Sequence, residues 1–177
     1  MPVIDLSSAA TVREMHPRFG SYARTDLGDG AGLSQFGVAI EVLEPGALSS
    51  ERHWHEEEDE FLMVLEGAPT LVENRGESLL APGDCLAWPK GVANAHHLVN
   101  RTDAPLRYLV AGWRAPRDVV HYPDIGRHAV EGVAGREMQD GAEAGADDLP
   151  TARIDLAAAP VRTGSIYPQP YAAMMAG

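Results

Sequence analysis

The sequence of 177 residues is poor in several residue types, and each shortage excludes a class of protein. A single cysteine, Cys85, excludes a disulfide bond within the chain. Lys90 is the only lysine, and 14 basic residues stand against 26 acidic ones, which gives a net charge of −12. This charge opposes binding to the phosphates of nucleic acids and to anionic membranes. We therefore expect a protein whose partners include neither.

Long apolar stretches are missing as well. No apolar run approaches the ~18 residues of a membrane-spanning helix. The first ten residues lack the basic and apolar regions that mark a signal peptide. The sequence therefore predicts a cytoplasmic protein.

Aromatic residues make up only 6% of the chain, whereas glycine (18) and proline (13) are abundant, a balance that favours short strands and turns. In the segment 35–43, Phe36, Val38, Ile40 and Val42 alternate and so share one face of a strand. Similar short runs recur about every ten residues. The expected strands are 35–43, 48–55, 60–66, 70–73, 77–80, 84–88, 96–100 and 106–113. This pattern predicts an all-β sandwich or barrel.

The composition divides the chain into three parts. Residues 1–34 form an irregular N-terminal arm in this interpretation, and residues 35–115 form the barrel. Residues 116–177 are expected to be a partly irregular C-terminal extension that packs on the barrel or on a partner. Within it, residues 130–150 are rich in glycine, alanine and acidic residues, and we expect them to form a loop or a disordered segment.

Histidines gather in two places on the expected strands. His53 and His55 are two residues apart and therefore point to the same face of a strand. Glu60 follows after an acidic turn that can bring it back beside them, and the pair His96 and His97 lies some forty residues later. Three imidazoles and one carboxylate suit a divalent transition metal and leave coordination positions open for water or substrate. Glu60 is a candidate both for a ligand and for a catalytic general base.

The segment 46–67 resembles the first motif of the cupin superfamily. That motif consists of a glycine, five or six residues, His-x-His, three or four residues, a glutamate, six residues and a glycine. In this sequence it reads Gly46, His53, His55, Glu60 and Gly67, with both glycines in place.

The segment 83–100 resembles the second motif of the same superfamily. That motif is a glycine, five residues, Pro-x-Gly, two residues, a histidine, three residues and an asparagine. The sequence departs from it in one place, because four residues separate Gly91 from His96. His96 keeps the three-residue spacing to Asn100, so it is preferred to His97, which points the opposite way on a strand.

The flanking segments resemble a group of bacterial single-domain cupins that is loosely labelled sugar-phosphate-isomerase-like. The resemblance implies a small antiparallel jelly-roll barrel that assembles as a homodimer. It also implies one divalent metal ion (Zn, Mn, Fe or Ni) held by His53, His55, Glu60 and His96.

Two functions remain open at this point. The first is a metal-dependent enzyme, an isomerase, a lyase or a dioxygenase, that acts on a small carbohydrate-like or carboxylate metabolite by Lewis-acid or oxygen chemistry. The second is a non-enzymatic cupin that binds or senses a small molecule with an anchoring metal. A catalytic base near the metal would distinguish them, and the candidates are Glu60, Tyr108 and Tyr122. An isomerase for phosphorylated sugars also needs cations in its pocket, and the expected barrel strands offer few.

Overall fold

The computed structural model describes residues 3–132 and 135–141. Their regular secondary structure is almost entirely strand, with two short 3-10 helices, Asp29–Ala31 (η1) and Pro123–Ile125 (η2). The strands are β1 (Thr11–His16), β2 (Gly20–Asp26), β3 (Phe36–Leu43), β4 (Trp54–His55), β5 (Glu60–Glu66), β6 (Thr70–Glu73), β7 (Gly76–Leu79), β8 (Cys85–Trp88), β9 (His97–Val99), β10 (Leu106–Trp113), β11 (Arg117–Tyr122), β12 (Arg127–Gly132) and β13 (Gly135–Asp140).

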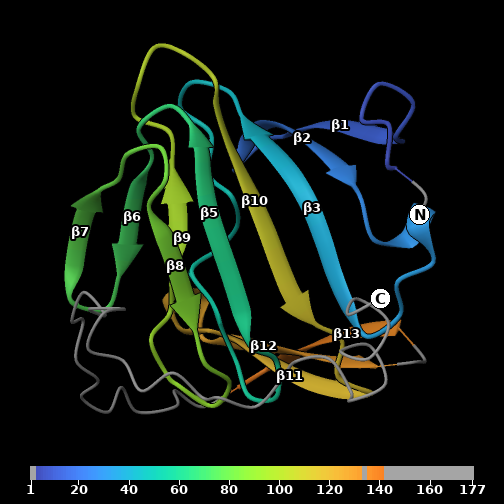
Figure 1. The fold of residues 1–177 in the computed structure, drawn as a ribbon. Coiled ribbons are helices and arrows are strands. Elements are labelled where there is room, and N and C mark those ends of the chain that lie inside the picture. The colour runs from blue at the N-terminus through green and yellow to red at the C-terminus, as the bar shows by residue number, and fades with distance from the viewer. Residues whose placement is uncertain (1–2, 133–134, 142–177) are drawn as a thin grey trace, which may run out of the picture.

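The strands form three antiparallel sheets (Figure 1). The largest has the order β1-β2-β3-β10-β5-β8, and a smaller one has the order β7-β6-β9. A third sheet, β13-β12-β11-β4, lies across the lower ends of the barrel strands in the view of Figure 1. The expected antiparallel jelly-roll barrel is confirmed.

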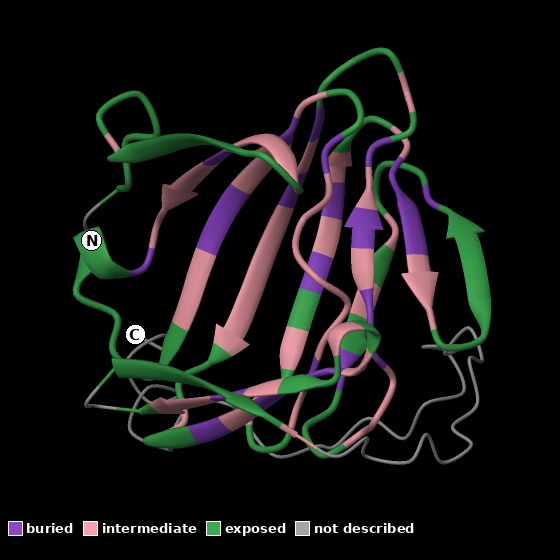
Figure 2. Ribbon diagram, turned by 180° about the vertical axis from the view of Figure 1, so that it is seen from behind, coloured by how far each residue is buried: buried purple, intermediate pink, exposed green. Residues whose placement is uncertain are grey.

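The core lies between the largest sheet and the three-stranded sheet, and buried residues alternate with less buried ones along the strands (Figure 2). This alternation follows from the two-residue period of a strand, which sends every second side chain inward. The third sheet has a small core of its own, built from Val120, Tyr122 and Ala129. The main core consists of Leu43, Ala47, Leu62, Val64, Leu71, Leu80, Trp88, Leu98, Leu106 and Tyr108.

Two residues of the predicted motifs have structural roles. Gly67 follows β5 with a φ of 84°, and a Cβ atom there would lie 2.7 Å from the Cβ of Leu106, so a side chain meets both strain and a clash. Asn100 is fully buried, and its side-chain amide donates hydrogen bonds to the carbonyl oxygens of Leu43 and Ala104, each at 2.9 Å. Both residues fix the connections between strands rather than the chemistry of a site.

The expected irregular arm is partly wrong, because residues 11–26 form the hairpin β1–β2 and β2 pairs with β3. The expected loop at 130–150 is wrong for the part that the structure describes. There β12 and β13 form a second hairpin on the third sheet. The remainder of that segment lies outside the described residues. The boundaries at 34 and 115 stay predictions.

The expected strand 48–55 is shorter than predicted. Only Trp54–His55 forms a named strand, and Leu48 and His53 make isolated bridges to Val99 and His96. Among the described residues, no helix is long and apolar enough to cross a lipid bilayer.

Candidate metal centre

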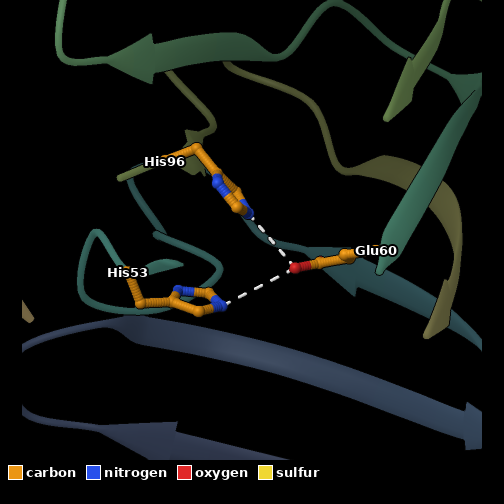
Figure 3. Close-up of side chains that lie close together, drawn as sticks. All are labelled: His53, Glu60 and His96. Carbon is orange, nitrogen blue, oxygen red and sulfur yellow. Dashed lines mark hydrogen bonds and ion pairs between the residues drawn. The ribbon is translucent and has the colours of Figure 1, made fainter. Parts of the chain in front are cut away.

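The four residues predicted as metal ligands come together inside the barrel, and we call them the His–Glu cluster. Figure 3 shows His53 and His96 pointing at the carboxylate of Glu60. The Nε2 atoms of His96, His53 and His55 lie 3.1, 3.8 and 3.9 Å from the same oxygen, Oε2 of Glu60. The sequence thus predicted which side chains converge.

Backbone pairing explains the convergence. His53 and His96 face each other across an antiparallel bridge, with N–O distances of 3.2 and 3.0 Å between their backbones. Glu60 begins β5, where it stands opposite Trp88 of β8. The indole ring of Trp88 stacks on the His96 ring at a centroid distance of 3.7 Å and an interplanar angle of 8°. This packing restricts rotation of the His96 imidazole and keeps its Nε2 atom turned toward Glu60.

Each imidazole of the cluster has an acceptor at its other ring nitrogen. Nδ1 of His53 lies 2.9 Å from the carbonyl oxygen of Glu51, and Nδ1 of His96 lies 3.1 Å from that of Asn94. Nδ1 of His55 lies 2.6 Å from the carboxylate of Asp118. An acceptor at Nδ1 favours the tautomer that carries its proton there, which leaves the Nε2 lone pair for a metal. Without a metal, Nε2 of His96 faces the Glu60 carboxylate at 3.1 Å, a hydrogen bond that requires a proton on Nε2 and that a metal ion would replace.

Burial sets the charges of the cluster. Loss of solvent lowers the pKa of His53 to about 4, so this imidazole is neutral at pH 7. Burial also acts to raise the pKa of Glu60, but the hydrogen bond with His96 and the charges of the neighbouring histidines outweigh it and lower that pKa to about 2. A neutral imidazole and an ionised carboxylate are the forms in which these side chains bind metal ions.

The donor set therefore fits a divalent transition metal: three imidazole nitrogens and one carboxylate oxygen. One ligand atom each from His53, Glu60 and His96 lie within 4.8 Å of one another. A second group, formed by His55, Glu58 and Asp118, meets the same distance criterion. Two ligands of one ion at about 2.0–2.2 Å from it stand roughly 3 Å or more apart. The 2.6 Å between His55 and Asp118 is therefore a hydrogen bond and not a shared ion.

Two adjoining cavities of about 200 and 250 Å³ reach the cluster, and both are lined by Arg24, His53 and Glu60. The first also contains Glu41 and Tyr108. Their summed volume falls in the lower part of the range of small-molecule sites, roughly 300–1,000 Å³. The cluster therefore lies beside a space that a small metabolite can enter.

A polar row crosses the wall of the first cavity. Arg24 on β2 and Tyr108 on β10 both stand directly opposite Glu41 on β3. The Tyr108 hydroxyl donates a hydrogen bond to the Glu41 carboxylate, and the Arg24 guanidinium forms an ion pair with it. Burial, followed by the charge of Glu41, raises the pKa of Tyr108 well above its ordinary value, so Tyr108 stays a donor. We call this group the Arg24–Glu41–Tyr108 row.

Sequence reasoning named Tyr108 but missed Arg24, Glu41 and Asp118. No local motif marks them, because each reaches the site through pairing between distant strands. The expectation of few cations concerned the barrel strands. Arg24 on β2 and Arg114 after β10 also line the cavities, and each pairs with a carboxylate. Tyr122, the other tyrosine candidate, places its ring 5.9 Å from that of His53.

Comparison with known proteins identifies the family. The family model of the cupin domain matches residues 39–112. A crystal structure described as a cupin-superfamily sugar phosphate isomerase from Silicibacter pomeroyi is 42% identical. The match covers 84% of this chain and 100% of that one, with a TM-score of 0.73. No protein of the curated set matches.

Two further structures are similar. One from Acidithiobacillus ferrooxidans, provisionally described as a sugar phosphate isomerase, is 33% identical over 67% of this chain and 76% of that one, with a TM-score of 0.62. One from Thermotoga maritima, described as a predicted oxalate decarboxylase, is 22% identical over 64% of this chain and 100% of that one, with a TM-score of 0.56, and shows the fold alone. The fold, both motifs and these matches agree that the chain belongs to the cupin superfamily.

Proposed function

We propose that the protein is a metal-dependent enzyme that acts on a small, oxygen-rich metabolite, and that a phosphorylated sugar is the first substrate class to test. The observation that carries the proposal is the Arg24–Glu41–Tyr108 row beside the His–Glu cluster in one cavity. A second carboxylate beside the metal ligands offers a group for proton transfer that the ligand set alone does not. An enzyme needs a group that can take up and return a proton.

In this proposal His53, His55, Glu60 and His96 hold one divalent ion (Zn, Mn, Fe or Ni). Such an ion supplies Lewis-acid chemistry, which polarises a carbonyl or hydroxyl oxygen of a bound substrate. Glu60 keeps the two roles that the sequence indicated, ligand and general base. Its low pKa means that it is ionised at neutral pH, as a metal ligand must be, but also that it is a weaker base than a carboxylate with an ordinary pKa.

Glu41 is the carboxylate that stands apart from the imidazoles. The hydroxyl of Tyr108 and the guanidinium of Arg24 hold it in place. In an aldose–ketose isomerisation Glu41 would take a proton from the hydroxyl-bearing carbon beside the carbonyl and return it to the former carbonyl carbon, while the hydroxyl proton passes to the carbonyl oxygen. Arg24 and Arg114 line the cavities and offer guanidinium donors to a substrate phosphate or carboxylate. Each also pairs with a carboxylate, Arg24 with Glu41 and Arg114 with Asp29. The similarity to two proteins described as sugar phosphate isomerases supports the same choice.

The test is an assay in D2O of the protein loaded with Mn²⁺ or Zn²⁺ against a panel of aldose and ketose phosphates. NMR would follow both turnover and exchange of the proton next to the carbonyl. We expect exchange with the wild type and none with His53→Ala. Glu41→Gln should lower kcat by roughly 10²- to 10⁴-fold, the usual contribution of a general base, while its metal content stays that of the wild type.

Glu66→Gln is the matched control, because Glu66 is exposed and forms an ion pair with Arg107 at the surface. It should leave the rate unchanged. Binding of the sugar phosphates without exchange would favour the alternative of a binding or sensing module. Equal activity of the wild type and His53→Ala would contradict the proposed site.

A further inference from the structure

Asp118 differs from the other groups that contact the imidazoles of the His–Glu cluster. The Nδ1 atoms of His53 and His96 face backbone carbonyl oxygens, whereas Nδ1 of His55 faces a carboxylate at 2.6 Å. Asp118 is 2% exposed, so little water competes for this contact. It lies on β11, outside residues 39–112 that match the cupin domain. The contact to His55 therefore comes from the C-terminal extension.

We propose that Asp118 is a positioning residue, which fixes the proton of His55 on Nδ1 and presents Nε2 to the metal. This inference rests on the proposed function only in its last step, the use of Nε2 as a ligand. A carboxylate behind a ligating histidine sets the tautomer and the direction of the ring, and it makes the other nitrogen more basic. The third sheet would thus be part of the metal centre.

The hydrogen bond at the second oxygen of Asp118 lets the inference predict the effect of one substitution, Asp118→Asn. Oδ1 accepts a hydrogen bond of 2.8 Å from the backbone N–H of Glu57, while Oδ2 faces His55. In Asp118→Asn the Glu57 N–H requires an oxygen, so the amide NH2 must turn toward His55. An amide N–H can donate only to an unprotonated Nδ1, so the imidazole proton moves to Nε2. The Nε2 lone pair is then no longer available to bind the metal.

The move of the His55 proton from Nδ1 to Nε2 in Asp118→Asn distinguishes a positioning role of Asp118 from a role in packing alone. If Asp118 only fills space and accepts hydrogen bonds, Asp118→Asn keeps its shape and should be the mild variant, while Asp118→Ala should be the damaging one. If Asp118 sets the tautomer, Asp118→Asn should be at least as damaging to metal binding as Asp118→Ala. Neither ring nitrogen of His55 faces a competing donor in Asp118→Ala.

The first measurement needs neither metal nor substrate. Long-range ¹H–¹⁵N NMR spectra at pH 8, where free imidazole is neutral, report which ring nitrogen of His55 carries the proton. We expect Nδ1–H in the wild type and Nε2–H in Asp118→Asn. The matched control is Asp84→Asn, because Asp84 also accepts a backbone N–H, that of Ala81 at 2.9 Å, but contacts no histidine. It should leave the His55 signals unchanged.

The second measurement is the affinity for Co²⁺ alone, obtained by competition with a chelator. Asp118→Asn should bind Co²⁺ about 10- to 100-fold more weakly than the wild type, the usual effect of removing such a partner. The Asp84→Asn control should match the wild type.

A proton on Nε2 in the wild type would overturn the inference, and so would an Asp118→Asn variant that keeps both the Nδ1–H tautomer and full affinity. A wild type with the Nδ1–H tautomer that binds no Co²⁺ would refute the proposed function, yet it would support the role of Asp118 in setting the tautomer.

Discussion

At the scale of single residues, the site depends on which imidazole nitrogen is free and on whether each ring is neutral. The acceptors at Nδ1 of His53, His55 and His96 favour a free Nε2, and burial keeps the His53 ring neutral. The His-x-His spacing and the following Glu60 predicted this convergence, because alternation along a strand is a local property. The acceptors themselves were beyond prediction, since they come from backbone carbonyls and from Asp118, 63 residues from His55.

The lowered pKa of His53 gives a pH dependence of stability in the metal-free protein. Its pKa is about 4 in the folded state against 6.5 for the ordinary residue, so the unfolded chain takes up the proton first as the pH falls. The free energy of unfolding should therefore fall between pH 7 and pH 5, and His53 accounts for about 2 kcal/mol of that loss.

Urea denaturation of the chelator-treated protein at both pH values would measure this difference. Glu60 does not affect the comparison between pH 7 and pH 5. Its contribution to the free energy of unfolding is lost only as the pH falls from 4.5 toward about 2. His53→Gln should show a smaller loss than the wild type over the same interval. An identical loss in the two proteins would contradict the account.

At the scale of elements, most strands that the sequence predicted have a buried face, although β7 was predicted and is exposed at all four positions. β5, β6 and β10 have the predicted bounds, and buried and less buried residues alternate along part of β5 and β10. β11 was missed although its burial alternates too. The missed strands β1 and β13 are exposed at all six positions. Backbone pairing with β2 and β12 holds them, so their side chains carry no apolar pattern from which a strand could be predicted.

The turn after β5 offers a test of the barrel's tight connections. Gly67→Ala should lower the free energy of unfolding by about 2–4 kcal/mol, since it combines a left-handed backbone with a clash against Leu106. Gly83→Ala is the matched control, because Gly83 has a φ of 92° and no atom within 4 Å of the added Cβ. It should cost only about 1–2 kcal/mol, the backbone strain alone. Equal losses for the two variants in thermal or urea denaturation would rule out the Leu106 contact as the cause.

At the scale of the whole molecule, residues from outside the matched cupin domain complete the site. The N-terminal hairpin supplies Arg24, and the C-terminal extension supplies Asp118. The sequence predicted a barrel with a metal at its centre, but it treated both flanks as covering segments. Their contribution depends on how β2 and β11 pair with β3 and β4, and no local pattern encodes these long-range pairings.

The homodimer that the resemblance implied stays a prediction, and the structure suggests where to look for it. β1 forms one edge of the largest sheet, with Val12 and Met15 53% and 81% exposed, and an edge strand favours pairing with a second copy. Light scattering should give twice the chain mass of 19.0 kDa. Met15→Glu should weaken the dimer, whereas Leu79→Glu on the edge strand β7 should not. A monomeric wild type, or equal effects of the two variants, would contradict this assignment.

The central claim is that the His–Glu cluster binds one divalent metal ion, and elemental analysis tests it most directly. The purified protein would be compared with its triple variant His53→Ala, His55→Ala, His96→Ala, after both are loaded with excess metal and desalted. The account predicts close to one equivalent of a transition metal per wild-type chain and almost none in a triple variant that circular dichroism shows to be folded. Equal metal content in the two proteins, or a wild type that retains no Mn, Fe, Ni or Zn, would contradict it.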